Sequence, residues 1–490
     1  MRAARDYLAI GLAKISAESP KWDRRENYYR GKQDLPFAPE GVNQEYLSLR
    51  EQSIANWLQL AMDAPIQRLR VDGFRTGRKG SADESAWSDV WQANRLDARQ
   101  RIVYNQMMVH GRGVMSVWPN KANSARPIVR PENCKRVFIE KNPEDPFSSL
   151  WTVKTFYVND RRLGSAGIYD VSKVKSVAVV FDAVSWVRFE RGGALMIGDW
   201  IAVDSGVNPL GENPFVPYDF KLDADGDSHD AISPLIPAQD AINTIRFNTL
   251  LAMQFSAYRQ RVFVGYDPTA RDTQGNVLYQ KNANGTDRLD SNGQKMPIIN
   301  SPGRIGVDRA LIFPGADTKV FDLAESNLKN YIEVLGEFLT QLFAVGQIPP
   351  QYLLSRMANL SGDALAGAES TLASLVRDLQ TNTGESHEQV MRLANKARGS
   401  GETDVASEVI WADGEARSFA QIVDAITKLI ATGFPHESAY EMIPGATPQK
   451  VKVWMEQMDG AANNDPILNA ARALQGTEPP PPVNDPASVG

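Results

Sequence analysis

Acidic side chains cluster in the segment LDADGDSHDA, at a spacing that suggests a cation site. The run contains Asp223, Asp225, Asp227 and Asp230. An EF-hand calcium loop that starts at Asp223 requires glycine at its sixth position and glutamate at its twelfth. This chain has Ser228 and Pro234 at those positions. We therefore predict no metal site, and we expect an acidic turn in which Ser228 or Asp230 caps the helix that follows.

Two glycine-containing segments resemble phosphate-binding loops, but neither has the required pattern. A P-loop ending in Gly31-Lys32 needs glycine at position 26 and serine or threonine at position 33, where the chain has Glu26 and Gln33. The segment Gly111-Arg112-Gly113 follows a predicted helix and precedes a predicted strand, which is the reverse of the order in dinucleotide-binding folds. The sequence therefore indicates no nucleotide cofactor.

Histidine and cysteine, the usual catalytic and metal-binding residues, are sparse. Cys134 is the single cysteine, so an intrachain disulfide and a cysteine-cluster metal site are both excluded. The four histidines lie in four separate segments with no metal-ligand spacing: His110, His229, His387 and His436. No catalytic constellation is found in the sequence, so we predict that the protein is not an enzyme and uses no cofactor.

Size and charge narrow the class of protein further. The chain has 490 residues and a formal net charge of −6. This length predicts several lobes, and the acidic balance argues against tight, sequence-independent binding of nucleic acid. No apolar run reaches the length of a membrane span, and the N-terminus lacks the pattern of a signal peptide. We expect a protein that is made in a cytoplasm and does not enter a membrane.

A long loop between two predicted helices is the most distinctive feature of the chain. Residues 326 to 345 carry apolar side chains at three- and four-residue spacing, which predicts an amphipathic helix that stops at Gly346. Pro349 and Pro350 prevent its continuation, and Ser361 begins a second helix of residues 362 to 397. The connection of about sixteen residues is longer than most loops in compact domains. Such a loop is typically functional.

The remaining segments predict an α+β protein with a long helical strut. Two helical units come first, and the second spans residues 83 to 109. Between residues 114 and 220, segments rich in β-branched and aromatic residues predict strands. Residues 233 to 260 predict a helix of about 42 Å, which residues 326 to 345 should accompany as an antiparallel partner. Residues 261 to 319 between them read as strands and turns, with no internal repeat.

Several motifs in order along the chain resemble the bacteriophage portal proteins, in particular the SPP1-type portals of actinobacterial phages. They are YYRGKQDLPF, NWLQLAMDAPIQRLRVDGFR, the W-x3-W-x2-N-x-LD unit from Trp87 to Asp97, HGRGVMSVWP, GVNPLGENPFVPYDF with SPLIPAQDAIN, NLSGDALAGAES, and FAQIVDAITKLIATGFPHESAYEM. Each is modest alone, but their order and spacing together are specific.

The resemblance implies the portal fold, an α+β architecture with an α/β wing, long stem helices, a small β clip and a helical crown. On this resemblance the wing comprises residues 1 to 229 and 362 to 410, and its second part is a long kinked helix. The stem comprises the helices of 230 to 260 and 320 to 345, and the clip comprises 261 to 319 between them. The tunnel loop is 346 to 361, the crown is 411 to 460, and residues 461 to 490 form a disordered tail.

The resemblance also implies a function and a set of partners. Portal proteins form a ring of identical subunits, typically twelve, at one capsid vertex of the virion, after assembly in the host cytoplasm. The ring passes double-stranded DNA during packaging and ejection, without sequence specificity. Its implied protein partners are the terminase large subunit, which is the separate packaging motor, the head-tail adaptor, the major capsid protein and the scaffold.

The tunnel loop supplies the expected channel residues. We expect Gln347, Gln351, Arg356 and Asn359 to contact DNA, with Lys329 as a channel candidate on the stem. Two alternatives remain open at this stage. A minor capsid or adaptor protein would form rings without a central stem, and a DNA-processing enzyme would need two or three carboxylates around a metal ion.

Overall fold

The computed structural model describes most of the chain, in ranges separated by short gaps. These ranges are 2–38, 44–76, 83–159, 174–192, 198–257, 261–264, 269–299, 319–322, 328–349, 362–399, 406–412, 419–443, 446 and 448–463. The chain divides into two compact units. Unit 1 comprises Met1–Gln33, Asn56–Gln239 and Thr340–Gly490, and unit 2 comprises Asp34–Ala55 and Asp240–Leu339. The predicted α+β class is confirmed.

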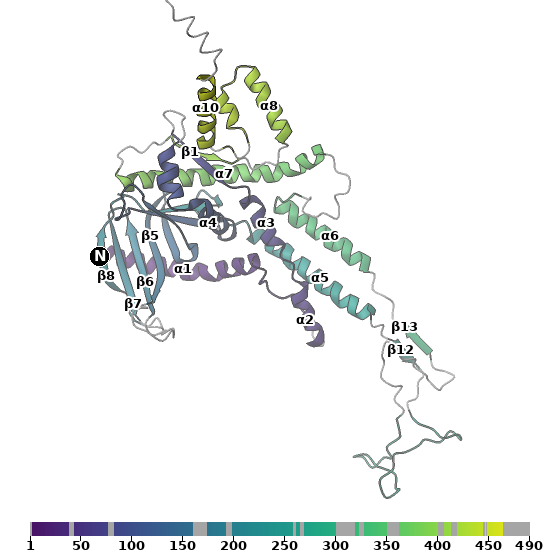
Figure 1. The fold of residues 1–490 in the computed structure, drawn as a ribbon. Helices are drawn as coiled ribbons and strands as arrows, with labels where there is room; N and C mark the ends of the chain where they lie inside the picture. Colours follow the sequence, from purple (N-terminus) through teal and green to yellow (C-terminus); the bar gives the residue numbers. More distant parts are fainter. Residues whose placement is uncertain are drawn as a thin grey trace, which may run out of the picture. The chain divides into compact units, whose positions relative to one another are not determined.

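A five-stranded antiparallel sheet and a long helix form one core of unit 1 (Figure 1). The strands follow one another as a meander: β4 (Val137–Asn142), β5 (Asp145–Asn159), β6 (Val174–Asp182), β7 (Ser185–Gly192) and β8 (Ile201–Val207). Helix α1 (Arg2–Tyr29) covers one face, where Leu8 packs among Val153 and Phe189. The ring of Tyr7 stacks on Trp151 at 4.7 Å between centroids. The alternating β-branched segments thus form the predicted strands.

A second sheet of three strands and helix α4 form the adjoining part of unit 1. Its order is β3-β2-β9, with β2 (Arg112–Trp118), β3 (Ile128–Glu132) and β9 (Phe215–Asp219). The predicted single helical unit of residues 83 to 109 is instead interrupted: a π-helical segment, η1 (Ala86–Gln92), is followed by a turn and then by α4 (Leu96–His110). Arg95 adopts a left-handed conformation at the break, with φ of 56°.

Helix α7 and the C-terminal helices complete unit 1. Helix α7 (Gly362–Arg398) runs without interruption through Gly384 and contacts β2 and β9. Strand β1 (Val71–Arg75), which follows α3 (Trp57–Ile66), pairs with β14 (Glu408–Trp411). The last helices are α8 (Phe419–Ala431), α9 (His436–Tyr440) and α10 (Pro448–Asn463). Helix α10 passes the predicted end of the crown at residue 460, and the remainder of the predicted tail, residues 464–490, lies outside the described residues.

Arg25 on α1 fixes the start of the predicted strut within unit 1. Its guanidinium lies 2.7 Å from the Asp230 carboxylate and donates to Ser233 Oγ and to the carbonyl oxygen of His110. Asp230 also accepts the backbone N–H of Ser233 at 2.6 Å, where the 3₁₀ turn η5 (Ser233–Leu235) leads into α5 (Ile236–Ala257). Asp230 is therefore the capping residue, while Ser228 donates its hydroxyl to Asp219.

Unit 2 contains α2 (Gln44–Ser53), most of α5 and the first part of α6 (Leu328–Val345). Arg246 on α5 donates to the carbonyl oxygen of Ser53, and the Asn243 side chain accepts the N–H of Ala55. Most of α5 and the first part of α6 lie in this unit, and their antiparallel partnership stays a prediction. Strand β12 (Arg261–Val264), in the predicted clip, pairs antiparallel with β13 (Lys319–Asp322). Most of β13 falls in the range predicted for the second stem helix, 320–345, and the helix described there begins at Leu328.

Residues 269–299 form a branched β module that the sequence analysis missed (Figure 1). Three hydrogen-bonded turns repeat the pattern Asp or Asn followed three residues later by glycine: 272–276, 282–286 and 290–294. The glycines of the three turns, Gly275, Gly285 and Gly293, are all left-handed. A closed triangle of backbone hydrogen bonds joins Ala270, Leu278 and Ile298, and a second joins Gln280, Arg288 and Met296. The repeated turns create branch points without a large apolar core.

Helix α4 approaches strand β2 closely at Gly113, and a substitution there tests this packing. A methyl group at this position would collide with the carbonyl oxygen and side chain of Val103, both on rigid elements. We expect Gly113→Ala to lower the free energy of unfolding by about 2 kcal/mol. Gly192→Ala is the matched control, because nothing lies within 4 Å of its added methyl group. Urea unfolding measures both variants, and equal stabilities would contradict the described packing.

Candidate functional site

The amphipathic helix α6 has an apolar side that the described part of the chain covers only in part. Its C-terminal end is anchored, since Leu342 and Phe343 are buried and Phe343 meets Trp57 edge to face at 5.7 Å. The preceding turns are different: Ile332 is 63% exposed and Val334 is 47% exposed. Leu328, Tyr331, Leu335, Phe338 and Leu339 are only half-buried. The helical pattern predicted from the sequence is confirmed, and in the described part of the chain its apolar side is only partly covered.

The turn after α6 confirms the predicted end of the helix. The helix ends at Val345, directly before Gly346, and Gln347 takes a left-handed conformation with φ of 54°. The N–H of Ile348 donates to the carbonyl oxygen of Phe343, and that of Gln347 donates to Ala344, which is the Schellman pattern. Ile348 and Pro349 are buried, so the first residues of the predicted tunnel loop are fixed in unit 1.

The structure describes two of the five predicted channel residues. Gln347 is exposed at the end of α6. Lys329 lies near the other end of the helix, where its side chain is 81% exposed and its Nζ lies 3.9 Å from Glu333 Oε1. The two residues are therefore not brought together. The other three, Gln351, Arg356 and Asn359, lie outside the described residues.

The acidic segment LDADGDSHDA forms a hairpin, in which the carboxylate of Asp223 accepts hydrogen bonds from backbone N–H groups of the turn. Strands β10 (Lys221–Leu222) and β11 (Ser228–His229) flank the turn. Asp223 Oδ1 accepts the N–H groups of Asp225 and Asp227, and Gly226 is left-handed with φ of 85°. These backbone bonds lower the pKa of Asp223. No group of three or more potential metal ligands occurs among the described residues.

His387, which the sequence analysis left as surface or core filler, lies fully buried between two tyrosines. Its Nε2 lies 2.7 Å from the hydroxyl of Tyr104, and its Nδ1 lies 2.8 Å from the hydroxyl of Tyr218. The three residues come from α4, β9 and α7, so their meeting depends on the tertiary fold. Burial lowers the pKa of His387 to about 3, so the ring is neutral at pH 7. A neutral ring gives one donor and one acceptor, which the two hydroxyls satisfy.

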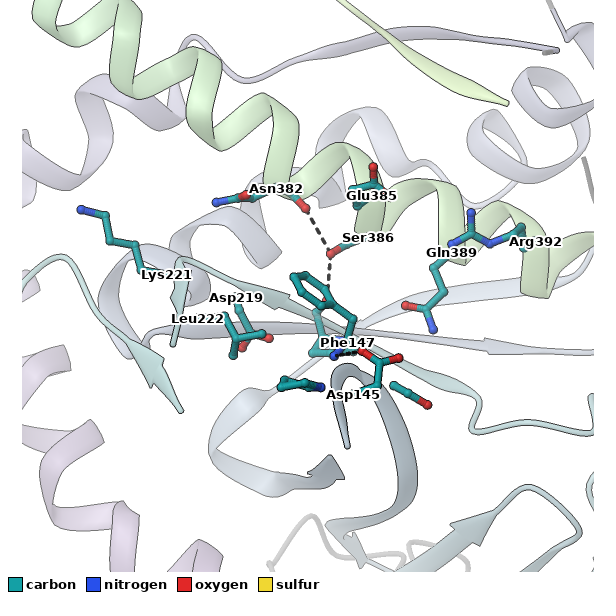
Figure 2. Close-up of a pocket in the computed structure, with 13 residues that line it drawn as sticks. Asp145, Phe147, Asp219, Lys221, Leu222, Asn382, Glu385, Ser386, Gln389 and Arg392 are labelled. Atoms are coloured by element: carbon teal, nitrogen blue, oxygen red, sulfur yellow. Dashed lines mark hydrogen bonds between the residues drawn. The ribbon is translucent and has the colours of Figure 1, made fainter. Parts of the chain in front are cut away.

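Beside this cluster, unit 1 has an open cavity of about 840 Å³ (Figure 2). Helix α7 supplies one wall, with a polar face formed by Asn382, Glu385, Ser386, Gln389 and Arg392. The first residues of β5, Asp145–Ser148, and residues of β9 and β10 supply the rest. The hydroxyl of Ser386 donates to the carbonyl oxygen of Pro217 at 2.9 Å. This hydroxyl is thus engaged with the backbone and has no histidine beside it in the cavity lining.

Asp219, also in the cavity lining, belongs to a buried ion-pair network. It lies 2.8 Å from Arg112 Nε and 2.7 Å from Lys141 Nζ. Burial alone would raise the pKa of Asp219, but the charges of Arg112 and Lys141 lower it. The carboxylate is therefore ionised and fully occupied, which suits a structural role better than proton transfer. The cavity as described offers polar contacts and no catalytic set.

Comparisons with known proteins give one consistent family. The family model described as phage portal protein, SPP1 Gp6-like, matches residues 12–464. A portal protein of Mycobacterium phage D29 is 25% identical over 407 residues, covering 78% of this chain and 74% of that protein. A portal protein of Mycobacterium phage L5 is 24% identical over 433 residues, covering 83% of this chain and 79% of that protein.

Among solved structures, a chain from the neck of an empty GTA particle, computed with C6 symmetry, is similar to this one. The similarity covers 82% of this chain and 96% of that chain, with a TM-score of 0.42 and 11% identity. Among the described residues, no helix is both long enough and apolar enough to cross a lipid bilayer.

The His387 cluster predicts a specific dependence of stability on pH. Because the pKa of His387 in the folded protein, about 3, is below the ordinary histidine pKa of 6.5, the unfolded chain binds the proton more tightly. The cluster's contribution is therefore fully present above pH 6.5 and falls as the pH drops towards 3, by up to about 1.4 kcal/mol per pH unit. In His387→Gln this dependence should be absent.

Unfolding of both proteins between pH 7.5 and pH 4.5, followed by tryptophan fluorescence, checks this prediction. Trp91 packs against the His387 ring at 5.2 Å and serves as a local reporter. The stability difference between wild type and variant should shrink as the pH falls. A difference that stays constant across this range would show that His387 is not held neutral.

Proposed function

Since this chain belongs to the SPP1 Gp6-like family of phage portal proteins, we propose that identical copies of it assemble into a ring whose channel conducts double-stranded DNA. Phage portal proteins are components of the virion. On this proposal the ring sits at one capsid vertex after assembly in the host cytoplasm. Its role is structural, and the energy for DNA movement comes from a separate terminase motor.

The uncovered apolar side of α6 is the observation that carries this proposal. A side chain of leucine or isoleucine size gains about 1.5–3 kcal/mol when it is fully buried. Several such side chains are half-buried or exposed along α6 in the described part of the chain. Contact with a neighbouring copy would cover them. In a closed ring this contact is head to tail, so each subunit presents two different surfaces.

The parts of the ring follow from the element order. We assign residues 1–229 and 362–410 to the wing, the helices within 230–260 and 320–345 to the stem, 261–319 to the clip, 346–361 to the tunnel loop and 411–460 to the crown. The clip, with strand β12 and the branched module, would dock the terminase and later the head-tail adaptor. The wing would face the major capsid protein and the scaffold.

The charge of the chain fits a conduit that releases DNA readily. Each lysine or arginine that neutralises a phosphate adds to the affinity for DNA, and a channel lined densely with them would slow the movement of DNA. The chain has a net charge of −6, and Lys329 has Glu333 nearby. The tunnel loop contains one arginine, Arg356. One such cation per subunit would guide the duplex without holding it, and no base-specific contact is required.

Charge on the exposed side of α6 should prevent ring formation. We expect Ile332→Asp, at a position that is 63% exposed, to leave the subunit folded and to shift the protein from rings to monomers. Glu333→Gln on the same helix is the matched control and should retain rings. Light scattering after size-exclusion chromatography measures the mass, and circular dichroism checks the fold. If Ile332→Asp forms rings of wild-type mass, α6 does not lie in the subunit interface.

The tunnel loop should be needed for DNA passage and not for assembly. Because Ile348 and Pro349 are buried, the segment to be replaced starts after these two residues. Replacing residues 351–360 with a glycine-serine segment of equal length should give normal rings but phage heads without DNA. Packaged DNA protected from nuclease in infected cells is the measurement. Wild-type amounts of protected DNA would contradict the assignment of these residues to the channel.

A further inference from the structure

Unit 1 has a second large cavity, of about 940 Å³, on the side of helix α1 that faces α4. Its walls come from α1, α4, the end of β3 and the 3₁₀ turn η2 (Cys134–Arg136). Strand β5 contributes Thr155 and Tyr157. The cavity shares no lining residue with the cavity of Figure 2 and includes none of the predicted channel residues.

The cavity carries an excess of positive charge in an acidic protein. Four basic residues line it, against two acidic ones: Arg30, Arg101, Lys135 and Arg136, against Glu26 and Glu132. Both carboxylates are already paired. Glu26 is bound by Lys135 and Arg30, and Glu132 lies 2.7 Å from Lys154 Nζ. Arg101 and Arg136 have no carboxylate partner among the described residues. Two guanidinium groups therefore remain to bind an anionic group.

Apolar side chains and an unpaired polar atom lie beside these arginines. Ile102 and Tyr157 line the cavity, and each is 50% exposed. The guanidinium carbon of Arg136 lies 5.2 Å from the centre of the Tyr157 ring. The imidazole of His110 also lines the cavity, and its buried Nδ1 has no hydrogen-bond partner in the described part of the chain. The site thus combines cationic, apolar and hydrogen-bonding groups.

We propose that this cavity binds an acidic peptide segment of a partner protein. Carboxylates of the segment pair with Arg101 and Arg136, and an apolar side chain between them packs on Ile102 and Tyr157. Guanidinium groups bind carboxylates through paired hydrogen bonds, which adds geometric selectivity. Glu26 and Glu132 are paired with cations of this chain, so they do not compete for Arg101 and Arg136. A DNA duplex is too wide to enter a cavity of about 940 Å³, whereas a short peptide segment is not.

Fluorescence anisotropy of the full-length chain with a labelled peptide tests this proposal. The probe is a fluorescein-labelled peptide of sequence Glu-Glu-Leu-Asp-Glu-Leu, and the same peptide with lysine at every acidic position is the charge control. We expect saturable binding of the acidic probe that weakens as salt is added, because part of the attraction is screened. The double variant R101E/R136E should weaken binding about tenfold or more.

Arg5→Glu is the matched control, since Arg5 is exposed on α1 and does not line the cavity. It should bind the probe with an affinity like that of the wild type. If R101E/R136E melts at a lower temperature than the wild type, the single variants R101E and R136E are compared instead. Equal binding by wild type and charge-reversed proteins overturns the proposal. Displacement of the probe by a short DNA duplex at equal charge concentration also overturns it, in favour of nucleic acid.

Discussion

The uncovered apolar side of helix α6 is the constraint on which the account depends. A helix with this pattern is stable only when its apolar side is buried, and tertiary contacts normally supply most of that stability. Among the described residues, the C-terminal end around Leu342 and Phe343 is buried, while the preceding turns are half-buried or exposed. On the proposed function, another copy of the same chain supplies the missing cover, and a repeated head-to-tail contact would close into a ring.

Unit 1 provides rigid attachment for the ends of α5 and α6. Arg25 and Asp230 fix the first turn of the helical run that becomes α5, and the Schellman turn at Gln347 fixes the end of α6. The His387 cluster joins α4, β9 and α7 within the same unit. Both apolar packing and fully paired buried polar groups therefore hold the segments that flank the predicted tunnel loop.

Periodic patterns in the sequence predicted the helices and strands well, but they did not predict contacts between residues distant in sequence. The amphipathic spacing gave α6, and alternation gave the strands of the five-stranded sheet, because both signals are local. The His387 cluster was missed because Tyr104 and Tyr218 are distant in sequence and only the fold unites them. The branched β module had a local signal, three turns with aspartate or asparagine before glycine, that was overlooked. At the end of α6, Gln347 takes the left-handed position beside a glycine, which residue preferences alone do not predict. The candidate channel stays a prediction that rests on family resemblance, because no motif or spacing in the sequence marks the residues of a channel wall.

Cryo-electron microscopy of the purified wild-type chain tests the central claim most directly. The account predicts closed rings with a central channel, in which Ile332 and Leu335 of one subunit are buried against the next. Monomers, or rings in which the apolar side of α6 remains exposed to solvent, would contradict it.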